Sequence, residues 1–162
     1  MKDKILKQNI NGNIYIWKYL ENSRNYPGWN FTADKKACNC LLELFRLMQL
    51  CEWSSKKEIQ TSKPTINQFK IPNNQNREAK SKTSKKLILN FKKNEEQNFW
   101  KLIENENDIE IQFGEKKITD FENAVNEILK GNGDFAIANE TEDNILYFWW
   151  NSLEKETAYN NG

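Results

Sequence analysis

Apolar residues recur at helical spacing between residues 34 and 53. The members of this stripe are three or four positions apart: Ala37, Leu41, Leu44, Met48 and Cys51. Residues at this spacing lie on one face of an α-helix. Either Thr32 or Asp34 can cap its first turn through a side-chain oxygen. The pattern therefore predicts a buried helix over residues 34–53.

The apolar positions before this helix fit two different structures. Ile14 and Ile16 alternate as they would in a strand, whereas Ile14 and Trp17 have the spacing of a helix face. The polar stretch and the Pro-Gly pair that follow favour the helix. We therefore expect a first helix over residues 13–24.

Three aromatic residues surround that Pro-Gly pair: Tyr26, Trp29 and Phe31. Aromatic side chains next to a buried helix usually pack back onto it, which places these three in the core. They can also project as a recognition edge, because Tyr and Trp are preferred anchors of protein interfaces. The core is the favoured interpretation for Trp29, and Tyr26 is kept as a candidate contact residue.

Residues 54–84 interrupt the apolar pattern. They are rich in Ser, Lys, Asn and Gln, and they contain two prolines. This composition is typical of a long exposed loop or linker. We therefore expect a single domain over residues 1–162, with residues 54–84 as a flexible basic loop.

The second half of the chain predicts strands around one helix. A capping box of Thr119 and Glu122 begins this helix, and Gly131 ends it. The strands are expected over residues 86–91, 98–103, 108–113, 134–138 and 145–150. The order α-α-linker-β-β-β-α-β-β predicts an α+β fold in which helices pack on an antiparallel sheet of about five strands.

The stretch ILYFWW, residues 145–150, carries bulky side chains on both faces of its predicted strand. A sheet with one face in water shows polar residues at alternate positions instead. Both faces of this strand must therefore be covered. The N-terminal helices and the linker can cover the second face, and so can a partner or a second copy of the chain. Trp150 is accordingly a candidate contact residue.

The net charge of +1 hides an uneven distribution of charge along the chain. Residues 54–93 hold eleven Lys or Arg and two acidic residues, a net charge of +9. Residues 94–162 hold five Lys and sixteen acidic residues, a net charge of −11. An asymmetry of this kind informs about binding partners and not about the fold.

The chain lacks the residues that most catalytic and metal sites use. It contains no His, the commonest general base and metal ligand. The three cysteines fall on one predicted helix, where Cys40 and Cys51 are about 16 Å apart, too far for a disulfide. We therefore expect no catalytic residue, no metal and no cofactor. Unpaired thiols, and the lack of a signal peptide or membrane span, favour the cytoplasm.

A compact, aromatic-rich and unevenly charged α+β domain of this kind resembles the immunity proteins that neutralise bacterial toxins. The resemblance implies a non-catalytic inhibitor with a cognate toxin as its partner. An acidic inhibitor suits a cationic toxin such as a nuclease, because complementary charge speeds association. The candidate contact residues are Glu110, Glu140, Glu142, Asp143, Tyr26 and Trp150.

Two other functions remain open at this point. The basic stretch 56–93 carries the kind of charge that neutralises nucleic-acid phosphates, although no helix or stacking platform accompanies it. The acidic residues of the second half can also serve a hydrolase that uses carboxylates.

Overall fold

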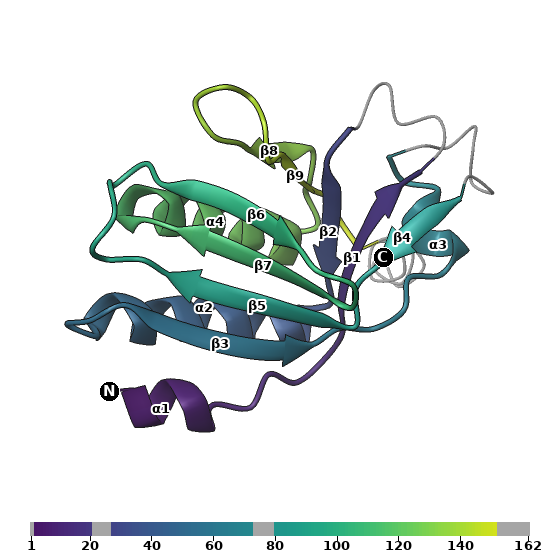
Figure 1. Ribbon diagram of the computed structural model, residues 1–162. Coiled ribbons are helices and arrows are strands. Elements are labelled where there is room, and N and C mark those ends of the chain that lie inside the picture. The colour runs from purple at the N-terminus through teal and green to yellow at the C-terminus, as the bar shows by residue number, and fades with distance from the viewer. Residues whose placement is uncertain (1, 21–26, 73–79, 152–162) are drawn as a thin grey trace.

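A computed structural model describes residues 2–20, 27–72 and 80–151. They form a mixed α+β fold with two sheets (Figure 1). In chain order the elements are α1 (Lys2–Lys7), β1 (Ile14–Tyr19), β2 (Trp29–Ala33), α2 (Lys35–Leu50), β3 (Ser55–Gln60), α3 (Ile66–Phe69), β4 (Ser81–Thr83), β5 (Lys86–Phe91), β6 (Trp100–Glu104), β7 (Asp108–Phe113), α4 (Glu115–Leu129), β8 (Phe135–Ile137) and β9 (Leu146–Phe148).

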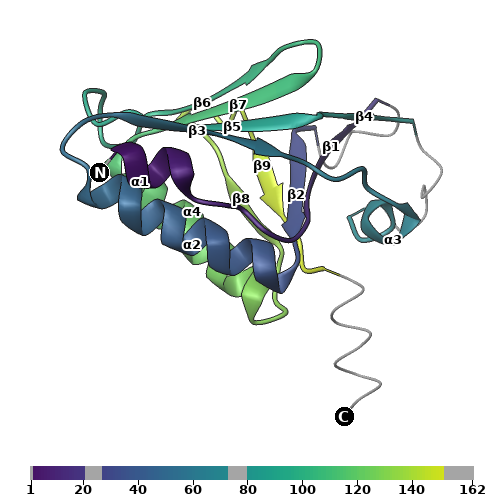
Figure 2. The ribbon, with the colours of Figure 1, turned by 90° about the horizontal axis from the view of Figure 1, so that it is seen from below.

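The four-stranded sheet has the order β3-β5-β7-β6. Helices α2 and α4 lie side by side along one of its faces, and α1 packs beside α2 and β3 (Figure 2). β5 and β7 are parallel, while β3 and β6 are antiparallel to their neighbours. Among the described residues, no helix is long and apolar enough to span a membrane.

The five-stranded sheet has the order β4-β1-β2-β9-β8 and stands at one end of the four-stranded sheet (Figure 1). β2 and β9 are parallel, and the other pairs are antiparallel. The α+β class is therefore confirmed, but the single antiparallel sheet of about five strands is wrong. The described chain has two sheets, each with one parallel pair.

Aromatic rings join the two sheets and the helices into one core. Phe121 of α4 is fully buried at the centre, with its ring centroid 4.8 Å from that of Phe45 and 5.4 Å from that of Phe148. Phe31 of β2 and Phe113 of β7 pack against the same ring. Aromatic pairs at these separations stabilise the fold by more than the burial of their apolar area alone.

The predicted helix over residues 13–24 is wrong, because residues 14–19 form strand β1. Ile14 and Ile16 face the main core, while Trp17 and Tyr19 belong to a second hydrophobic cluster. A strand buried on both faces has apolar residues without strict alternation. The helical spacing of Ile14 and Trp17 arose in this way.

The predicted core position of Trp29 and Phe31 is confirmed. Both belong to β2, in which every residue is buried, and Trp29 is only 3% exposed. Asp34 caps α2 by accepting a hydrogen bond from the Ala37 amide at 2.9 Å. Tyr26 lies outside the described residues.

The predicted loop over residues 54–84 is corrected by three elements. β3 pairs with β5 over six residues, α3 forms one helical turn, and β4 pairs with β1. The buried positions of β3 are Ser55, Lys57 and Ile59. Because two of these three are polar, the strand has no visible apolar alternation. Residues 73–79 of the predicted loop lie outside the described part.

Helix α4 begins earlier than predicted. Its N-cap is Gly114, so the predicted capping box of Thr119 and Glu122 does not start the helix. Ile118 in the first turn is 1% exposed and anchors the helix to the core. The predicted end is confirmed, since Gly131 has φ +84° and its amide bonds to the Ile128 carbonyl at 2.9 Å.

The second face of β1 and β9 is covered by the chain itself. Trp17, Tyr19 and Trp149 form a buried cluster against which Phe69 and Ile71 pack. The Tyr19 hydroxyl donates to the Phe69 carbonyl at 2.6 Å, and the Trp17 and Phe69 rings meet edge to face. Within the described structure, residues of the predicted linker therefore help to cover the second face of ILYFWW.

Candidate protein-binding site

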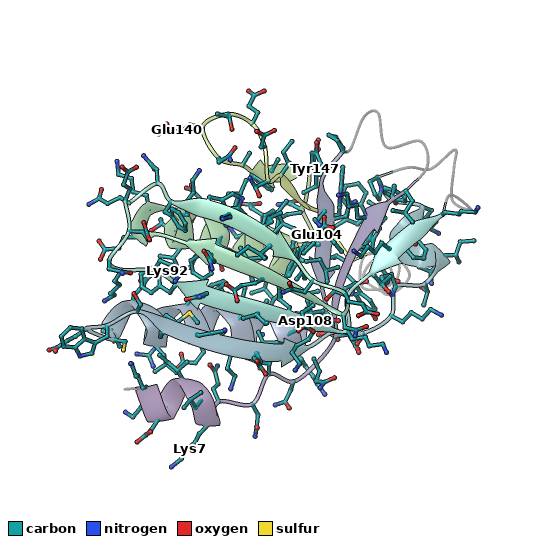
Figure 3. The ribbon with its side chains drawn as sticks, viewed as in Figure 1. Lys7, Lys92, Glu104, Asp108, Glu140 and Tyr147 are labelled. Carbon is teal, nitrogen blue, oxygen red and sulfur yellow. The ribbon has the colours of Figure 1, made fainter. Side chains whose placement is uncertain are left out.

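The acidic turn, residues 139–143, joins β8 to β9. Its backbone is fixed from within, because the Asn139 side-chain oxygen accepts from the Asp143 amide at 2.7 Å. The Glu142 amide also donates to the Asn139 carbonyl at 3.0 Å. Glu140, Glu142 and Asp143 are exposed, and Figure 3 shows Glu140 on the loop that projects beyond the sheets. The turn is therefore an ordered platform for negative charge.

Asn144 attaches this turn to the edge of the four-stranded sheet. Its side-chain oxygen accepts a hydrogen bond from the Leu102 amide of β6 at 3.1 Å. Its carbonyl oxygen accepts from the Trp100 indole at 2.7 Å. Asn144 has φ +54° and Glu142 has φ +59°. Asn adopts this left-handed conformation more readily than most residues, which suits it to the anchoring position.

A cleft of about 250 Å³ opens between this turn, β2 and β6. We call it the acidic cleft, and its main lining residues are Gly28, Trp29, Leu102, Glu104, Glu142 and Asp143. The charged residues that line it, among those the structure describes, are three acidic side chains and one lysine, Lys18. Gly28 is required there, because a Cβ atom would lie 2.2 Å from the Ile145 carbonyl oxygen.

Glu104, at the end of β6, ties the two sheets together inside this cleft. Its carboxylate accepts hydrogen bonds from Lys18 Nζ at 2.9 Å and from Trp29 Nε1 at 2.7 Å. Lys82 lies 3.5 Å away. Partial burial acts to raise the pKa of Glu104, but these hydrogen bonds and positive charges outweigh it and lower the pKa. The carboxylate is therefore ionised at neutral pH.

Two of the predicted contact residues lie elsewhere. Glu110 is on the outer face of the four-stranded sheet and does not line the acidic cleft. It accepts from Gln112 and Asn90 and lies 3.6 Å from Lys56. Burial acts to raise the pKa of Glu110, but these partners lower it overall. Trp150 packs against Trp149 and is half-buried.

The basic segment, residues 54–93, uses much of its charge inside the fold. Three of its lysines form ion pairs with acidic residues on other strands. These pairs are Lys56 with Glu110, Lys82 with Glu104, and Lys86 with Glu58. Among the described residues, no ion pair reaches the three carboxylates of the acidic turn.

Two further lysines of the basic segment bind the ends of helices. Lys57 Nζ donates to the carbonyl oxygens of Leu6 at 2.8 Å and Gln8 at 2.7 Å, where α1 ends. Lys93 Nζ donates to the carbonyl oxygens of Gln49 and Cys51, where α2 ends. Cations at helix C-termini donate hydrogen bonds to free carbonyls and interact favourably with the negative end of the helix dipole. These lysines therefore serve the structure.

The sequence did not predict Lys18, Trp29 and Glu104 as one group. Glu104 is 86 residues from Lys18 and 75 residues from Trp29 along the chain. No local motif can carry a contact over such separations. Within the described residues, no three potential metal ligands lie together, and the three cysteines form no disulfide with one another. The acidic cleft contains more carboxylate acceptors than amines. Its carboxylates therefore suit the binding of a cationic group.

Comparisons with protein-family models, with curated proteins and with solved structures gave no match.

Proposed function

We propose that the protein is a non-catalytic binding protein whose acidic turn recognises a cationic partner protein, as an immunity protein recognises its toxin. One observation carries this proposal: the carboxylates of Glu140, Glu142 and Asp143 are exposed and without ion pairs in the described chain. By contrast, Glu104 and Glu110 on the strands form ion pairs with lysines. Unpaired charge on an ordered turn is available to a partner.

The electrostatics support a protein that binds rather than reacts. Complementary surface charge raises association rates and fixes orientation. An inhibitor that covers the substrate site of a cationic nuclease needs no chemistry of its own. Such an inhibitor acts in the cytosol, where cysteines such as Cys38, Cys40 and Cys51 stay reduced.

The test compares three baits in partner capture from a lysate of the source cell. The first is the wild type, and the second carries Glu140→Lys, Glu142→Lys and Asp143→Lys. The third is a matched control with the same change of net charge at exposed positions outside the cleft: Glu52→Lys, Glu95→Lys and Glu96→Lys.

We expect the wild type and the control to retain the same cationic protein, and the acidic-turn variant to lose it. The loss is larger at low salt, because exposed charges are screened over about 8–10 Å at physiological ionic strength. Equal retention by all three baits would contradict the proposal. Retention of nucleic acid alone, equally by all baits, would favour the alternative function of the basic segment.

A further inference from the structure

The acidic cleft has the dimensions and the lining of a receptor for one side chain. Its volume is about 250 Å³, which is somewhat larger than a single long side chain. Pro27, Leu102 and Ile145 give it apolar walls, and Glu104 lies inside it between the two sheets (Figure 3). An occupant therefore needs an aliphatic stem and a polar head.

Glu104 is held in place before any ligand arrives. The indole of Trp29, which is 3% exposed, and the ammonium of Lys18 both bond to the same carboxylate oxygen, Oε1. Among the described residues, the other oxygen, Oε2, has an ion-pair contact with Lys82 alone, at 3.5 Å. A carboxylate offers about four acceptor positions, so Oε2 can accept further donors. A preorganised acceptor binds a donor without the cost of ordering its own side chain.

The charge of the lining selects the head group of the occupant. Among the described residues, Lys18 is the one cation that lines the cleft, against Glu104, Glu142 and Asp143, so an anionic ligand is repelled. A guanidinium presents five N–H donors in a plane and can bond to two carboxylates at once. An ammonium is a compact charge whose three N–H donors are not arranged in one plane.

We propose that the acidic cleft receives the side chain of one arginine of the partner protein, with the guanidinium between Glu104 Oε2 and the carboxylates of the turn. This inference rests on the proposed function and specifies how the partner is recognised. It adds Glu104 to the contact residues, with Leu102 and Ile145 as walls for the arginine stem.

A partner-independent experiment tests this site. N-acetyl-arginine amide is titrated into the ¹⁵N-labelled protein, and the Trp29 indole and Leu102 amide resonances are followed. N-acetyl-citrulline amide, which has nearly the same shape without the charge, is the control ligand. We expect saturable shifts with the arginine probe only. Glu104→Gln should weaken its binding about tenfold, because a hydrogen bond to a charged group is lost. Equal shifts from both probes, or none from either, overturn the arginine site.

Steric filling separates this inference from the proposed function. Leu102→Trp places a large ring at the wall of the cleft, and Ile103→Trp places the same ring on the opposite face of β6, where Ile103 pairs with Glu110. Thermal melting establishes that both variants fold. We expect Leu102→Trp to lose the captured partner and Ile103→Trp to keep it. If Leu102→Trp keeps the partner while the acidic-turn variant loses it, the arginine site fails and the proposed function stands. If the Leu102→Trp variant and the acidic-turn variant both keep the partner, the arginine site and the proposed function both fail.

Discussion

Five lysines of the basic segment bind other parts of the fold, whereas the carboxylates of the acidic turn form no ion pair with the described residues. Lys56, Lys82 and Lys86 pair with acidic residues, and Lys57 and Lys93 bind helix ends. Glu140, Glu142 and Asp143 are exposed on a turn that hydrogen-bonds to itself. The comparison teaches that the net charge of a segment does not identify a binding surface. Charge that the fold leaves unpaired is the better guide.

The largest expected effect tests whether the basic segment belongs to the core. Ile59 on β3 is 4% exposed within the main core. Ile59→Ala should lower the free energy of unfolding by about 2–5 kcal/mol, as for other large-to-small core substitutions. Gln60→Ala, at the exposed neighbouring position, should change it by no more than about 0.5 kcal/mol. Urea unfolding measures both, and equal small effects would return the segment to a loop.

An intermediate effect tests whether its lysines are structural. Lys57→Met keeps the aliphatic stem but removes the donor to the carbonyls of Leu6 and Gln8. We expect a loss of about 1–3 kcal/mol, the usual cost of leaving buried polar groups without partners, and faster amide exchange in α1. Lys63→Met at an exposed position is the matched control. Equal stability of the two variants would show that the end of α1 does not depend on Lys57.

The smallest effect concerns a paired carboxylate, Glu110, and the dependence of the unfolding free energy on pH. The folded state lowers the pKa of Glu110, so its contribution to stability is present above its unfolded pKa of about 4.3 and is lost as pH falls through the folded value. Glu110→Gln should therefore show a shallower loss of unfolding free energy below about pH 4. Identical curves for this variant and the wild type would mean that Gln112, Asn90 and Lys56 together contribute nothing measurable through Glu110.

Elements with a strong apolar period were predictable from the sequence. The stripe of α2 and the runs of β5 and β7 each bury apolar side chains where the pattern placed them. β3 was not predictable, because Ser55 and Lys57 occupy its buried positions. β1 was assigned to a helix because both of its faces are buried by different clusters. Apolar periodicity marks the boundary between core and water. β1 lacks such a boundary, and β3 has one but places polar residues on its buried side.

The candidate site was predictable in part. The exposure of Glu140, Glu142 and Asp143 could be predicted, because a short turn of polar residues lies between two apolar runs. Glu104 was not predictable, because its partners come from β1, β2 and β4. Glu110 is predicted as a contact residue together with the turn, but the register of β7 places it on the outer face of the four-stranded sheet. A charge pattern along the chain cannot supply such contacts.

The parallel pairing of β2 with β9 also constrains how the chain folds during synthesis. The four strands of one sheet lie between residues 55 and 113, so this sheet can assemble soon after those residues leave the ribosome. The other sheet needs β9, and the bond from the Trp149 indole to Asn30 spans 119 residues. Contacts of such long range form slowly. The apolar faces of β1 and β2 therefore remain partly uncovered until β9 has been synthesised. A nascent chain is then most prone to aggregation in the interval before β9 emerges.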